Sequence, residues 1–410
     1  MLPCFMPFSD ELRILIIAFH CDPEADGEPW SGWQWVEEAA RNYSVTLVTG
    51  SAGKPGIERR RTTLDLTALY VEPPRLTPPG LRQLLWEETA WKLIRLRHAE
   101  QPFHLVHQIT PGTRFPASRL PVPSVWGPLH GGGAVPPGFG PFLGPYRMRE
   151  TFRRHFQRPW LPLAWRSLER CSVLWVANRT TLTWLPDRFR KKAVVVPPGA
   201  ARTDVPDAFE PLAGQPLSLL YAGNGEPDHA VPLVFAALKA ARLRPGWTFH
   251  IPGDGPVLSA WQAEARRLGL SGHVHFPGRL SPVELELYAC QSHALVYPAL
   301  CDGDGMPMLE GMARGIPVVY LDHGSSAGMA DRFSGIPIPV RSPEESIRQM
   351  ARAFERLEHE PEWRRTLGAN ARARVIQHYS REAKAQQLQQ TYEALLAPTR
   401  PPAWRETLLR

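Results

Sequence analysis

The chain lacks a hydrophobic run long enough to cross a membrane. A membrane-spanning helix needs about 20 consecutive apolar residues, whereas the longest apolar run, residues 14–19, has the length of a single β-strand. The opening MLPCFMPFSDEL also lacks the basic stretch and apolar core of a secretory signal peptide. We therefore expect neither a membrane-spanning nor a secreted protein.

Cysteine is scarce and scattered. The five cysteines show no spacing typical of a metal site, and an odd number cannot all pair. This pattern favours a reducing, cytoplasmic location. The thiol of Cys301, beside Asp302, is either a reactive group or a small buried residue at the end of a strand, and we favour the second interpretation. The cysteines are Cys4, Cys21, Cys171, Cys290 and Cys301.

A surplus of positive charge is confined to part of the chain. The net charge is +7, and the excess of Lys and Arg lies in the first 200 residues. Much of it lies between Arg147 and Arg170, where hydrophobic side chains are interleaved. Such a stretch is typical of peripheral contact with an anionic membrane, and equally typical of a helix whose arginines face water and whose aromatic side chains face the core. No nucleic-acid-binding motif occurs, so we expect no nucleic-acid partner. The interleaved residues are Phe152, Phe156, Trp160, Leu161 and Trp165.

Internal repeats and low-complexity tracts are also absent from the sequence. Instead, strand-like and helix-like segments alternate in both halves, which predicts an α/β protein with two open, mostly parallel sheets. A linker rich in Pro, Ala and Asp is expected near 197–215. The expected strands are residues 13–19, 45–49, 104–108, 124–126, 173–177, 193–197, 217–222, 248–252, 274–277, 294–297 and 317–321. The expected helices are residues 34–41, 77–100, 231–241, 256–268, 282–292 and 308–314.

The most informative segment is YPALCDGDGMPMLEGMARGIPVV. It predicts a strand, a glycine-rich turn, a helix that Pro307 begins, and a second strand. Gly303 and Gly305 permit the backbone to approach a ligand closely, and the amides at the start of the helix suit a diphosphate. The carboxylates of Asp302 and Glu310 flank this turn and accept hydrogen bonds from hydroxyl groups. Together these residues predict a pocket for a nucleotide-sugar.

This segment resembles the acidic motif of the retaining GT-B glycosyltransferases of family 4, the glycosyl transferases group 1. The family pattern is Glu or Asp, seven residues, Glu, and a helix ending in A-x-G-x-P-V-V; here ARGIPVV follows Glu310. The resemblance covers nearly the whole chain. Other pieces follow in the family's order: ILIIAFH…WSGWQWVEEAARNYSVTLVTG, FHLVHQITPGTRFPASRLPVPSVWGPLHGGG, VVVPPGA, LLYAGN, HIPGDGP and VHFPGRLSPVELELYACQSHALVYP.

The resemblance implies a GT-B fold, in which two Rossmann-like domains with parallel sheets face a central cleft. Residues 1–200 would form the N-terminal, acceptor-binding domain, and residues 210–382 the C-terminal domain that binds the nucleotide-sugar donor. A last helix at about 383–410 would pack back on the first domain. Ligands of such sheets bind at the carboxyl ends of the strands.

Positions that match the family's motifs imply a donor site. Glu310 would bind the ribose hydroxyls, Asp302 the hydroxyls of the donor sugar, and the amides of Gly305 and Met306 the diphosphate. Arg279 lies where family members pack the base, although an exposed loop cation is an equally good interpretation. The implied donor-binding positions are Gly32, Gly223, Asn224, Gly253, Arg279, Gly303, Asp304, Gly305, Met306, Pro307 and Glu310.

On the acceptor side, the resemblance implies a loop that faces the cleft. His130 interrupts the family's usual Pro-x-Gly there. It is either an active-site base or sugar contact, because imidazole titrates near neutrality, or a tolerated loop residue, and the same two interpretations apply to His107. The implied acceptor-side positions are Trp126, Gly127, His130, Gly131 and His107, and the implied catalytic positions are Asp302, Glu310, His130 and His229.

The clearest departure from the family follows the first strand of the second half. Family members usually carry G-R-x-x-x-x-K-G, whose Arg and Lys neutralise the leaving diphosphate. Here the run is GNGEPDHA, so Asn224 replaces the arginine and His229 the lysine, while Glu226 and Asp228 add negative charge. Losing one stabiliser of this kind typically costs ~3 kcal/mol, or ~10²–10³ in rate.

Three explanations are open for this loss. Either a protonated His229 replaces the lysine, or Arg202 or Arg279 supplies a cation, or the protein is a degenerate GT-B protein that binds a nucleotide-sugar or a partner transferase without catalysis. The first two imply transfer of a sugar, with retention, from a UDP- or GDP-sugar to a hydroxyl of a glycan or lipid-linked acceptor. The protein would then take part in the synthesis of a cell-surface polysaccharide or glycoconjugate, at the inner face of the membrane.

Neither a cofactor nor a metal is expected for such a reaction, because the leaving phosphate would deprotonate the acceptor and the protein would supply positioning and charge stabilisation. A nucleotide-sugar epimerase of the same fold is a further alternative. A glycosidase that uses the pair Asp302 and Glu310 is disfavoured by the alternating parallel strands and the anion-binding turn.

Overall fold

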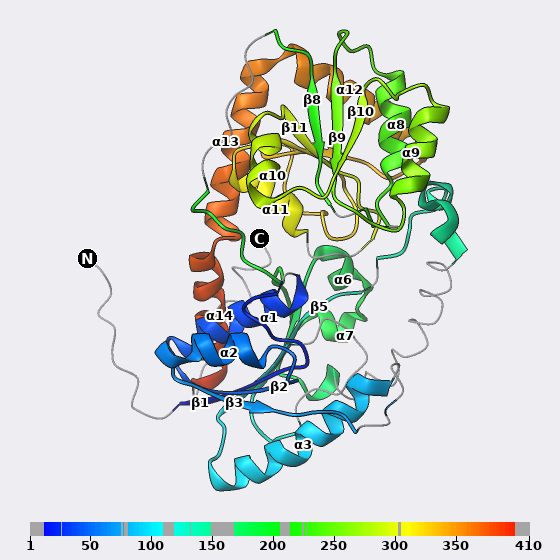
Figure 1. Ribbon diagram of the computed structural model, residues 1–410. Coiled ribbons are helices and arrows are strands. Elements are labelled where there is room, and N and C mark those ends of the chain that lie inside the picture. Colours follow the sequence, from blue (N-terminus) through cyan, green and yellow to red (C-terminus); the bar gives the residue numbers. More distant parts are fainter. Residues whose placement is uncertain are drawn as a thin grey trace, which may run out of the picture.

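Two parallel β-sheets organise the protein, one in the lower and one in the upper half of Figure 1. Neighbouring strands are parallel throughout both sheets. This agrees with the α/β class expected from the alternating pattern. The computed structural model describes residues 12–25, 27–74, 77, 81–109, 119–131, 133–148, 168–205, 214–223, 225–226, 228–301 and 305–397.

The first sheet has the strand order β3-β2-β1-β4-β5-β6-β7 within the described residues. The central strand β1 is almost wholly buried, because helices cover both faces of the sheet and its sequence RILIIA is apolar on both sides. The first three strands are added toward one edge of the sheet and the later strands toward the other, so the order switches between β1 and β4. Ligands of open parallel sheets bind at such a switch point. Its strands are β1 (Arg13–Ala18), β2 (Ser44–Thr49), β3 (Leu66–Tyr70), β4 (Leu105–Ile109), β5 (Ser124–Leu129), β6 (Val173–Val176) and β7 (Ala193–Val195).

The second sheet has the order β10-β9-β8-β11-β12-β13 in the part of the chain that is described. Its centre, β8 and β11, is apolar and buried, and helices pack on both faces to form separate clusters of buried side chains. Its strands are β8 (Ser218–Tyr221), β9 (Thr248–Pro252), β10 (Val274–Gly278), β11 (Ala294–Tyr297), β12 (Val318–Leu321) and β13 (Ile336–Ile338).

The helices agree with the expected pattern except at several ends. Helix α1 begins at Glu28, six residues before the expected start, and Trp33 and Trp35 are both buried within it. Gly32 therefore lies within a helix and not in a loop. The helices are α1 (Glu28–Ala40), α2 (Lys54–Arg60), η1 (Arg61–Thr63), α3 (Arg82–Glu100), η3 (Gly140–Tyr146), α6 (Arg179–Trp184), α7 (Asp187–Arg190), α8 (Val231–Ala240), α9 (Leu258–Arg267), α10 (Pro282–Cys290), α11 (Met306–Ala313), α12 (Pro343–His359), α13 (Pro361–His378) and α14 (Arg381–Leu396).

The two halves are joined by segments that cross in both directions. Helix α14 follows α13 out of the upper half and runs along the lower half in Figure 1, where Leu388 and Tyr392 enter the core beneath β1 and β4. In the other direction, Phe139 and Leu143, at the start of η3, are buried in the core of the second half beside α8. The limits assigned to the two domains stay a prediction. These crossings show that each core also contains residues from the other half of the sequence.

None of the described helices is long and apolar enough to cross a membrane. The basic stretch between Arg147 and Arg170 lies outside the described residues except for its two ends, so its contact with a membrane stays a prediction.

Candidate functional site

Helix α11 starts at the edge of the second sheet that is turned toward the first half (Figure 1). Its N-cap, Gly305, has φ 67°, in the left-handed region, and a Cβ there would lie 2.4 Å from the sulfur of Met329. Only glycine fits on both counts. The helix begins at Met306, two residues before the expected start, so Pro307 occupies its second position. Gly305 is therefore tightly packed at the start of α11, and the positive end of the helix dipole there suits an anion.

The first turns of α1 lie opposite this helix start. Between them runs Gly199, and a Cβ added there would lie 3.0 Å from Met306 Sδ and 3.1 Å from Ser31 Oγ. Gly32, the next residue of α1, packs against the carbonyl of His20, which would lie 3.1 Å from an added Cβ. The structure thus brings Ser31, which precedes Gly32, and Met306 against the same residue, Gly199, from different halves of the protein.

Glu310 lies on the exposed side of α11, one turn before an ion pair. Arg314 donates to both carboxylate oxygens of Glu286 on α10, with Nη2 2.6 Å from Oε2 and Nε 3.0 Å from Oε1. Its Nη1 donates to the backbone carbonyl of Glu310 at 2.8 Å. This network lowers the pKa of Glu286 through its hydrogen bonds to Arg314. It ties α10 to α11 beside the carboxylate implied to bind ribose.

His229 lies in the interior of the second half. Its residue is 8% exposed, its Nδ1 lies 2.6 Å from the hydroxyl oxygen of Tyr221, and its ring packs edge-on against Tyr297. Burial lowers the pKa of His229, against the opposing effect of Asp228. The burial of His229 disfavours the explanation that a protonated His229 replaces the missing lysine, and that explanation stays a prediction.

The loops that follow β8, β9 and β10 meet at one edge of the second sheet. The amide of Gly253 donates to Gly278 at 2.8 Å, and a Cβ added at Gly225 would lie 3.2 Å from the carbonyl oxygen of Asp254. Arg279 is highly exposed, and its Nη2 donates to Asp254 Oδ2 at 2.6 Å. Arg279 is thus an exposed cation with a carboxylate partner, placed beside the loop in which the family's cations are missing.

The other candidate replacement, Arg202, also has a carboxylate neighbour. Its Nε lies 3.5 Å from Asp204 Oδ1. Its charge contributes to lowering the pKa of Glu286, so Arg202 lies on the α10 side of the second half.

Gly223 lies in the segment that follows β8. It has φ 152°, and a Cβ added there would lie 2.5 Å from the Tyr221 hydroxyl.

His107, Trp126 and Gly127 lie inside the first half and do not face a cleft. His107 Nε2 donates to the Gly127 carbonyl at 3.0 Å, so Nδ1, 2.8 Å from the Tyr392 hydroxyl, accepts from it. Burial lowers the pKa of His107 to about 4. Trp126 is 0% exposed, and a Cβ on Gly127 would lie 2.1 Å from the carbonyl oxygen of Trp175. The expectation that these three residues contact acceptor is therefore corrected: they belong to strands β4 and β5, beneath the loops.

His130 and Gly131 follow β5 at the carboxyl end of the first sheet. His130 is half-buried, and the Gly131 carbonyl accepts a hydrogen bond from Thr181 Oγ1 at 2.8 Å. Asn178 caps the same helix, α6, through the amide of Thr181 at 2.8 Å. These residues lie at the sheet edge where the resemblance places the acceptor, and the role of His130 stays a prediction.

Several implied donor residues lie outside the described residues. They are Asn224, Asp302, Gly303 and Asp304. Cys301, which precedes them, is 1% exposed, as expected of a small buried residue. Among the described residues, no group of three His, Cys, Asp or Glu side chains could hold a metal ion.

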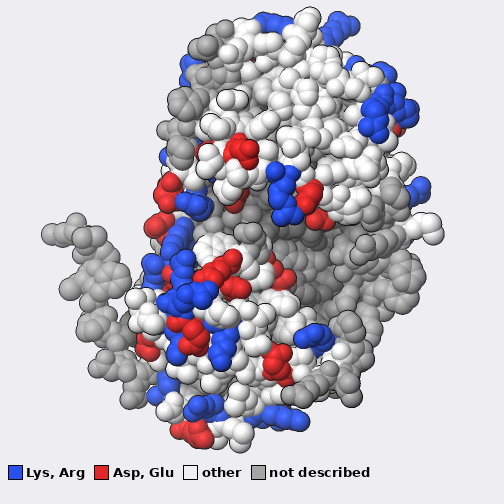
Figure 2. Space-filling view, in the orientation of Figure 1, with Lys and Arg blue, Asp and Glu red and all other residues white. Residues whose placement is uncertain are grey.

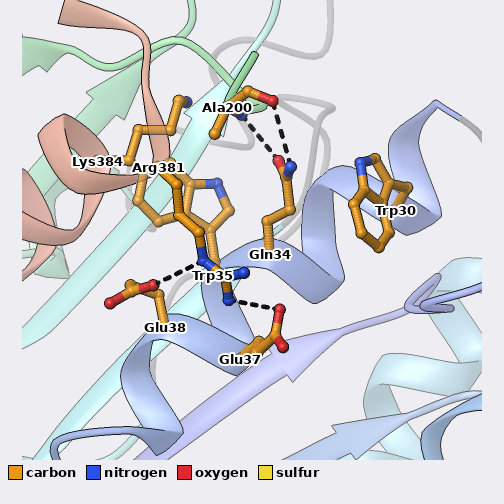
Figure 3. Close-up of a pocket in the computed structure, with 8 residues that line it drawn as sticks. All are labelled: Trp30, Gln34, Trp35, Glu37, Glu38, Ala200, Arg381 and Lys384. Atoms are coloured by element: carbon orange, nitrogen blue, oxygen red, sulfur yellow. Dashed lines mark hydrogen bonds and ion pairs between the residues drawn. The ribbon is translucent and has the colours of Figure 1, made fainter. Parts of the chain in front are cut away.

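A small pocket lies where the two halves join, behind α1 (Figure 3). Gln34 holds the backbone of Ala200 from both sides, accepting from its amide at 2.8 Å and donating to its carbonyl at 3.3 Å. Arg381 reaches across from α14 to the carboxylates of Glu37 and Glu38. Lys384 is 4% exposed, donates to the carbonyl of Pro197 and lies over the ring of Trp35, and burial lowers its pKa well below the usual range. These contacts hold α1, the segment 197–200 and α14 in one unit.

On the face drawn in Figure 2, the described residues form no surface of a single charge sign. Figure 2 shows basic and acidic side chains intermixed over the lower half and a hollow between the two halves. The carboxyl ends of the central strands in both sheets, and the start of α11, face this hollow.

Comparison with known proteins matches this architecture. Residues 207–374 match the family model of the glycosyl transferases group 1. Sucrose-phosphate synthase from Thermosynechococcus elongatus has a TM-score of 0.67 and 18% identity over 95% of this chain and 100% of its own. Anabaena HepE in complex with UDP has a TM-score of 0.64 and 15% identity over 93% of this chain and 100% of its own. The GT-B fold is thereby confirmed.

Sequence relatives match over shorter stretches. The putative glycosyltransferase EpsD of Bacillus subtilis is 30% identical over 166 residues, which are 40% of this chain and 42% of EpsD. The alpha-D-kanosaminyltransferase of Streptomyces kanamyceticus is 29% identical over 180 residues, 43% of this chain and 45% of that protein. The match spans less than half the length of each of these relatives.

Sequence reasoning missed three residues that the structure places at the meeting point of the halves. They are Ser31, Gly199 and Met329. The first two lie in WSGW, where only Gly32 was assigned to the donor site, and in VVVPPGA, which was recognised only as a piece of the family order. Their proximity depends on how the halves pack, which no local pattern contains.

Proposed function

We propose that the protein is a retaining glycosyltransferase. It transfers a sugar from a UDP- or GDP-sugar to a hydroxyl of a glycan or lipid-linked acceptor, in the synthesis of a cell-surface polysaccharide or glycoconjugate. The start of α11 carries the proposal, because Gly305, Met306 and Glu310 present a helix N-terminus and a carboxylate at the hollow between two parallel sheets. The names of the relatives, several of them transferases of sugars, support it.

In this reaction, the amides at the start of α11 hold the diphosphate, and Glu310 accepts hydrogen bonds from the ribose hydroxyls. Arg314 and Glu286 keep α11 in place. The leaving phosphate takes the proton of the acceptor hydroxyl on the same face of the sugar. The protein contributes positioning and stabilisation of developing charge.

The first test is thermal stabilisation by UDP, GDP and ADP and their sugar conjugates. A ligand at a hundredfold excess over its dissociation constant adds about 2.7 kcal/mol of stability, which a melting curve resolves. We expect a shift with one nucleotide, and loss of both the shift and of sugar transfer in Glu310→Ala. Glu100→Ala, an exposed carboxylate at the end of α3, is the matched control. Full transfer by Glu310→Ala would refute the site.

A second function is favoured by one observation. His229 is buried, and burial lowers its pKa, which disfavours a positive charge at the position where the family neutralises the diphosphate. A non-catalytic protein that binds a nucleotide-sugar or a partner transferase would need no such charge. Such a protein binds the nucleotide but turns over neither donor nor acceptor. The double variant Asn224→Arg, His229→Lys should then still show no sugar transfer. An epimerase would convert the donor in the absence of an acceptor, and chromatography would detect this. Neither the glycosyltransferase nor the non-catalytic protein would do so.

A further inference from the structure

We infer that the guanidinium of Arg179 supplies, from the first half, the positive charge that binds the diphosphate of the nucleotide-sugar. The inference rests on the proposed function and extends its site across the hollow. Arg179 lies outside the matched family model, which is confined to residues 207–374, and outside every segment that carries the resemblance. It would take the place of the family's cations, which are missing at Asn224 and His229.

The segment that follows β12 connects the start of α11 with the first half. On one side Met329 packs against Gly305, the N-cap of α11, since a Cβ on Gly305 would lie 2.4 Å from its sulfur. On the other side Thr180 Oγ1 donates to the carbonyl of Gly324 at 3.3 Å. Helix α6, which contains Thr180, lies on the side of the first half that is turned toward the second (Figure 1). The segment therefore joins the proposed diphosphate site to α6.

Arg179, the first residue of α6, lies against this segment. A Cβ added to Gly328 would lie 3.2 Å from both Cδ and Nε of Arg179, so the stem of the arginine packs on a residue of the other half that has no side chain. Gly328 has φ 85°, in the left-handed region that favours glycine. The next residue, Met329, is the one that packs against Gly305. The contact thus places the guanidinium one residue along this segment from the side chain that covers the α11 N-cap.

The charge of Arg179 has no carboxylate partner. The side chain is exposed, and no Asp or Glu of the described residues lies within ion-pair distance of it. The other guanidinium at this segment, that of Arg374, differs. It donates to the carbonyls of Gly328 and Met329 at 3.1 and 2.6 Å, and it pairs with Asp331 at 3.1 Å. Of the two cations, only Arg374 is therefore neutralised by the protein.

Both guanidinium groups act on the buried hydroxyl of Tyr379. Burial raises the pKa of Tyr379, and the charges of Arg374 and Arg179 oppose this rise. The carboxylate of Asp331 acts on the same hydroxyl in the opposite direction. Two cations and one carboxylate thus lie around Tyr379, so the group has an excess of positive charge on the side of the second half that meets α6.

A phosphate suits Arg179 better than the two cations considered from the sequence. Arg202 and Arg279 each have a carboxylate neighbour, at 3.5 and 2.6 Å, which a phosphate would have to displace. A guanidinium without such a neighbour presents a planar fork of N–H donors that matches phosphate oxygens. Since Arg179 belongs to the half opposite α11, its charge adds to the dipole of that helix from the other side of the ligand.

The test is the affinity of the nucleoside diphosphate that the wild-type protein binds, chosen from UDP, GDP and ADP by calorimetry. Loss of one contact to a charged group weakens binding by about tenfold or more. We expect Arg179→Gln to bind that diphosphate about tenfold more weakly and the corresponding nucleoside as wild type does. Arg179→Lys, which keeps the charge but not the fork, should lose less. Both variants should melt at the wild-type temperature without ligand, because the side chain is exposed.

The salt dependence of binding gives a second measurement. Added salt should weaken diphosphate binding more in wild type than in Arg179→Gln, because salt screens exposed charges. Arg97→Gln, at an exposed arginine of the first half that pairs with Glu100 at 3.5 Å, is the matched control and should change neither the affinity nor its salt dependence.

Two results would overturn the inference and leave the proposed function intact. The first is wild-type affinity for the diphosphate in Arg179→Gln. The second is an equal loss for the diphosphate and the nucleoside, because the arginine would then act on the shape of the site and not on the phosphates. Failure of the wild-type protein to bind any of the three diphosphates would instead refute the proposed function on which the inference rests.

Discussion

The hydroxyl of Tyr392 donates to Nδ1 of His107 across 2.8 Å, although 285 residues separate them. His107 lies in β4 and Tyr392 in α14, so this hydrogen bond joins the last described helix to the middle of the first sheet. Both side chains are fully buried, and Nε2 of the same imidazole donates to Gly127. Every polar atom of the ring is therefore satisfied within the core.

Tyr392→Phe removes this link without changing the shape of the core. We expect a loss of about 1–2 kcal/mol in the free energy of unfolding, because the imidazole acceptor is left buried without a partner. Urea denaturation of wild type and variant measures it. Tyr43→Phe, at a half-buried ring beside Tyr392, is the control and should change stability much less. Equal losses in both variants would contradict a specific role of the hydrogen bond.

A second prediction concerns a buried carboxyl group of α3. Glu87 is 2% exposed, and its Oε2 has no hydrogen-bond partner among the described residues. Burial raises the pKa of Glu87 to about 9, despite the nearby charge of Arg119. The folded protein therefore holds a proton that the unfolded chain releases above its ordinary pKa of 4.5, and this group's contribution to stability falls as the pH rises between these values.

Glu87→Gln keeps the size of the side chain and removes the titration. The variant should be more stable than wild type at pH 7, by about 2–3 kcal/mol at most, since one pKa unit corresponds to about 1.4 kcal/mol. The gain should grow from pH 6 to pH 8.5. Urea denaturation across this range measures it, with Glu88→Gln, an exposed neighbour paired with Arg119, as control. A pH-independent difference would show that Glu87 is ionised in the folded protein.

Much of the fold was predictable because its central strands are short, continuous apolar runs. Strands β9, TFHIP, and β11, ALVY, have the predicted limits, since Gly253 follows the first and Pro298 the second, and such residues mark the ends of a strand. The two missed strands, β3 and β13, lie at sheet edges, and each is only partly buried, so their hydrophobic pattern is weak. Helix α1 was predicted to start late because WSGW was taken for a loop, whereas it lies within the helix, with Trp33 buried and Trp30 half-buried.

The site was predictable only where one segment contains all its parts. The turn and helix at Gly305, Met306 and Glu310 follow from local pattern. The burial of His229 does not, because it depends on Tyr221 and Tyr297, which come from two strands that meet only in the folded sheet. For the same reason, His107 was assigned to the cleft although its ring is covered by α14.

The ion pair between Arg314 and Glu286 leads to a third prediction. Arg314 donates through a fork of two nitrogens and also holds the carbonyl of Glu310. Arg314→Lys keeps the charge but cannot reproduce this geometry. We expect the affinity for the nucleoside diphosphate to fall about three- to tenfold, measured by calorimetry. Arg365→Lys, at the exposed pair with Glu362, is the control, and an unchanged affinity in Arg314→Lys would show that the network does not position α11.

The last prediction concerns the contact that seats α11 on the sheet. Gly311 faces Leu295 of β11, and a Cβ added there would lie 1.7 Å from Leu295 Cδ1. In most helices, Gly→Ala is stabilising by about 1 kcal/mol. Here overpacking should reverse the sign, so Gly311→Ala should destabilise the protein by about 1–3 kcal/mol. Truncating the neighbour makes room for the methyl group, so Gly311→Ala in a Leu295→Ala background should cost less than in wild type. A double-mutant cycle in urea measures this coupling, and purely additive effects would show that α11 moves away from the sheet instead of clashing.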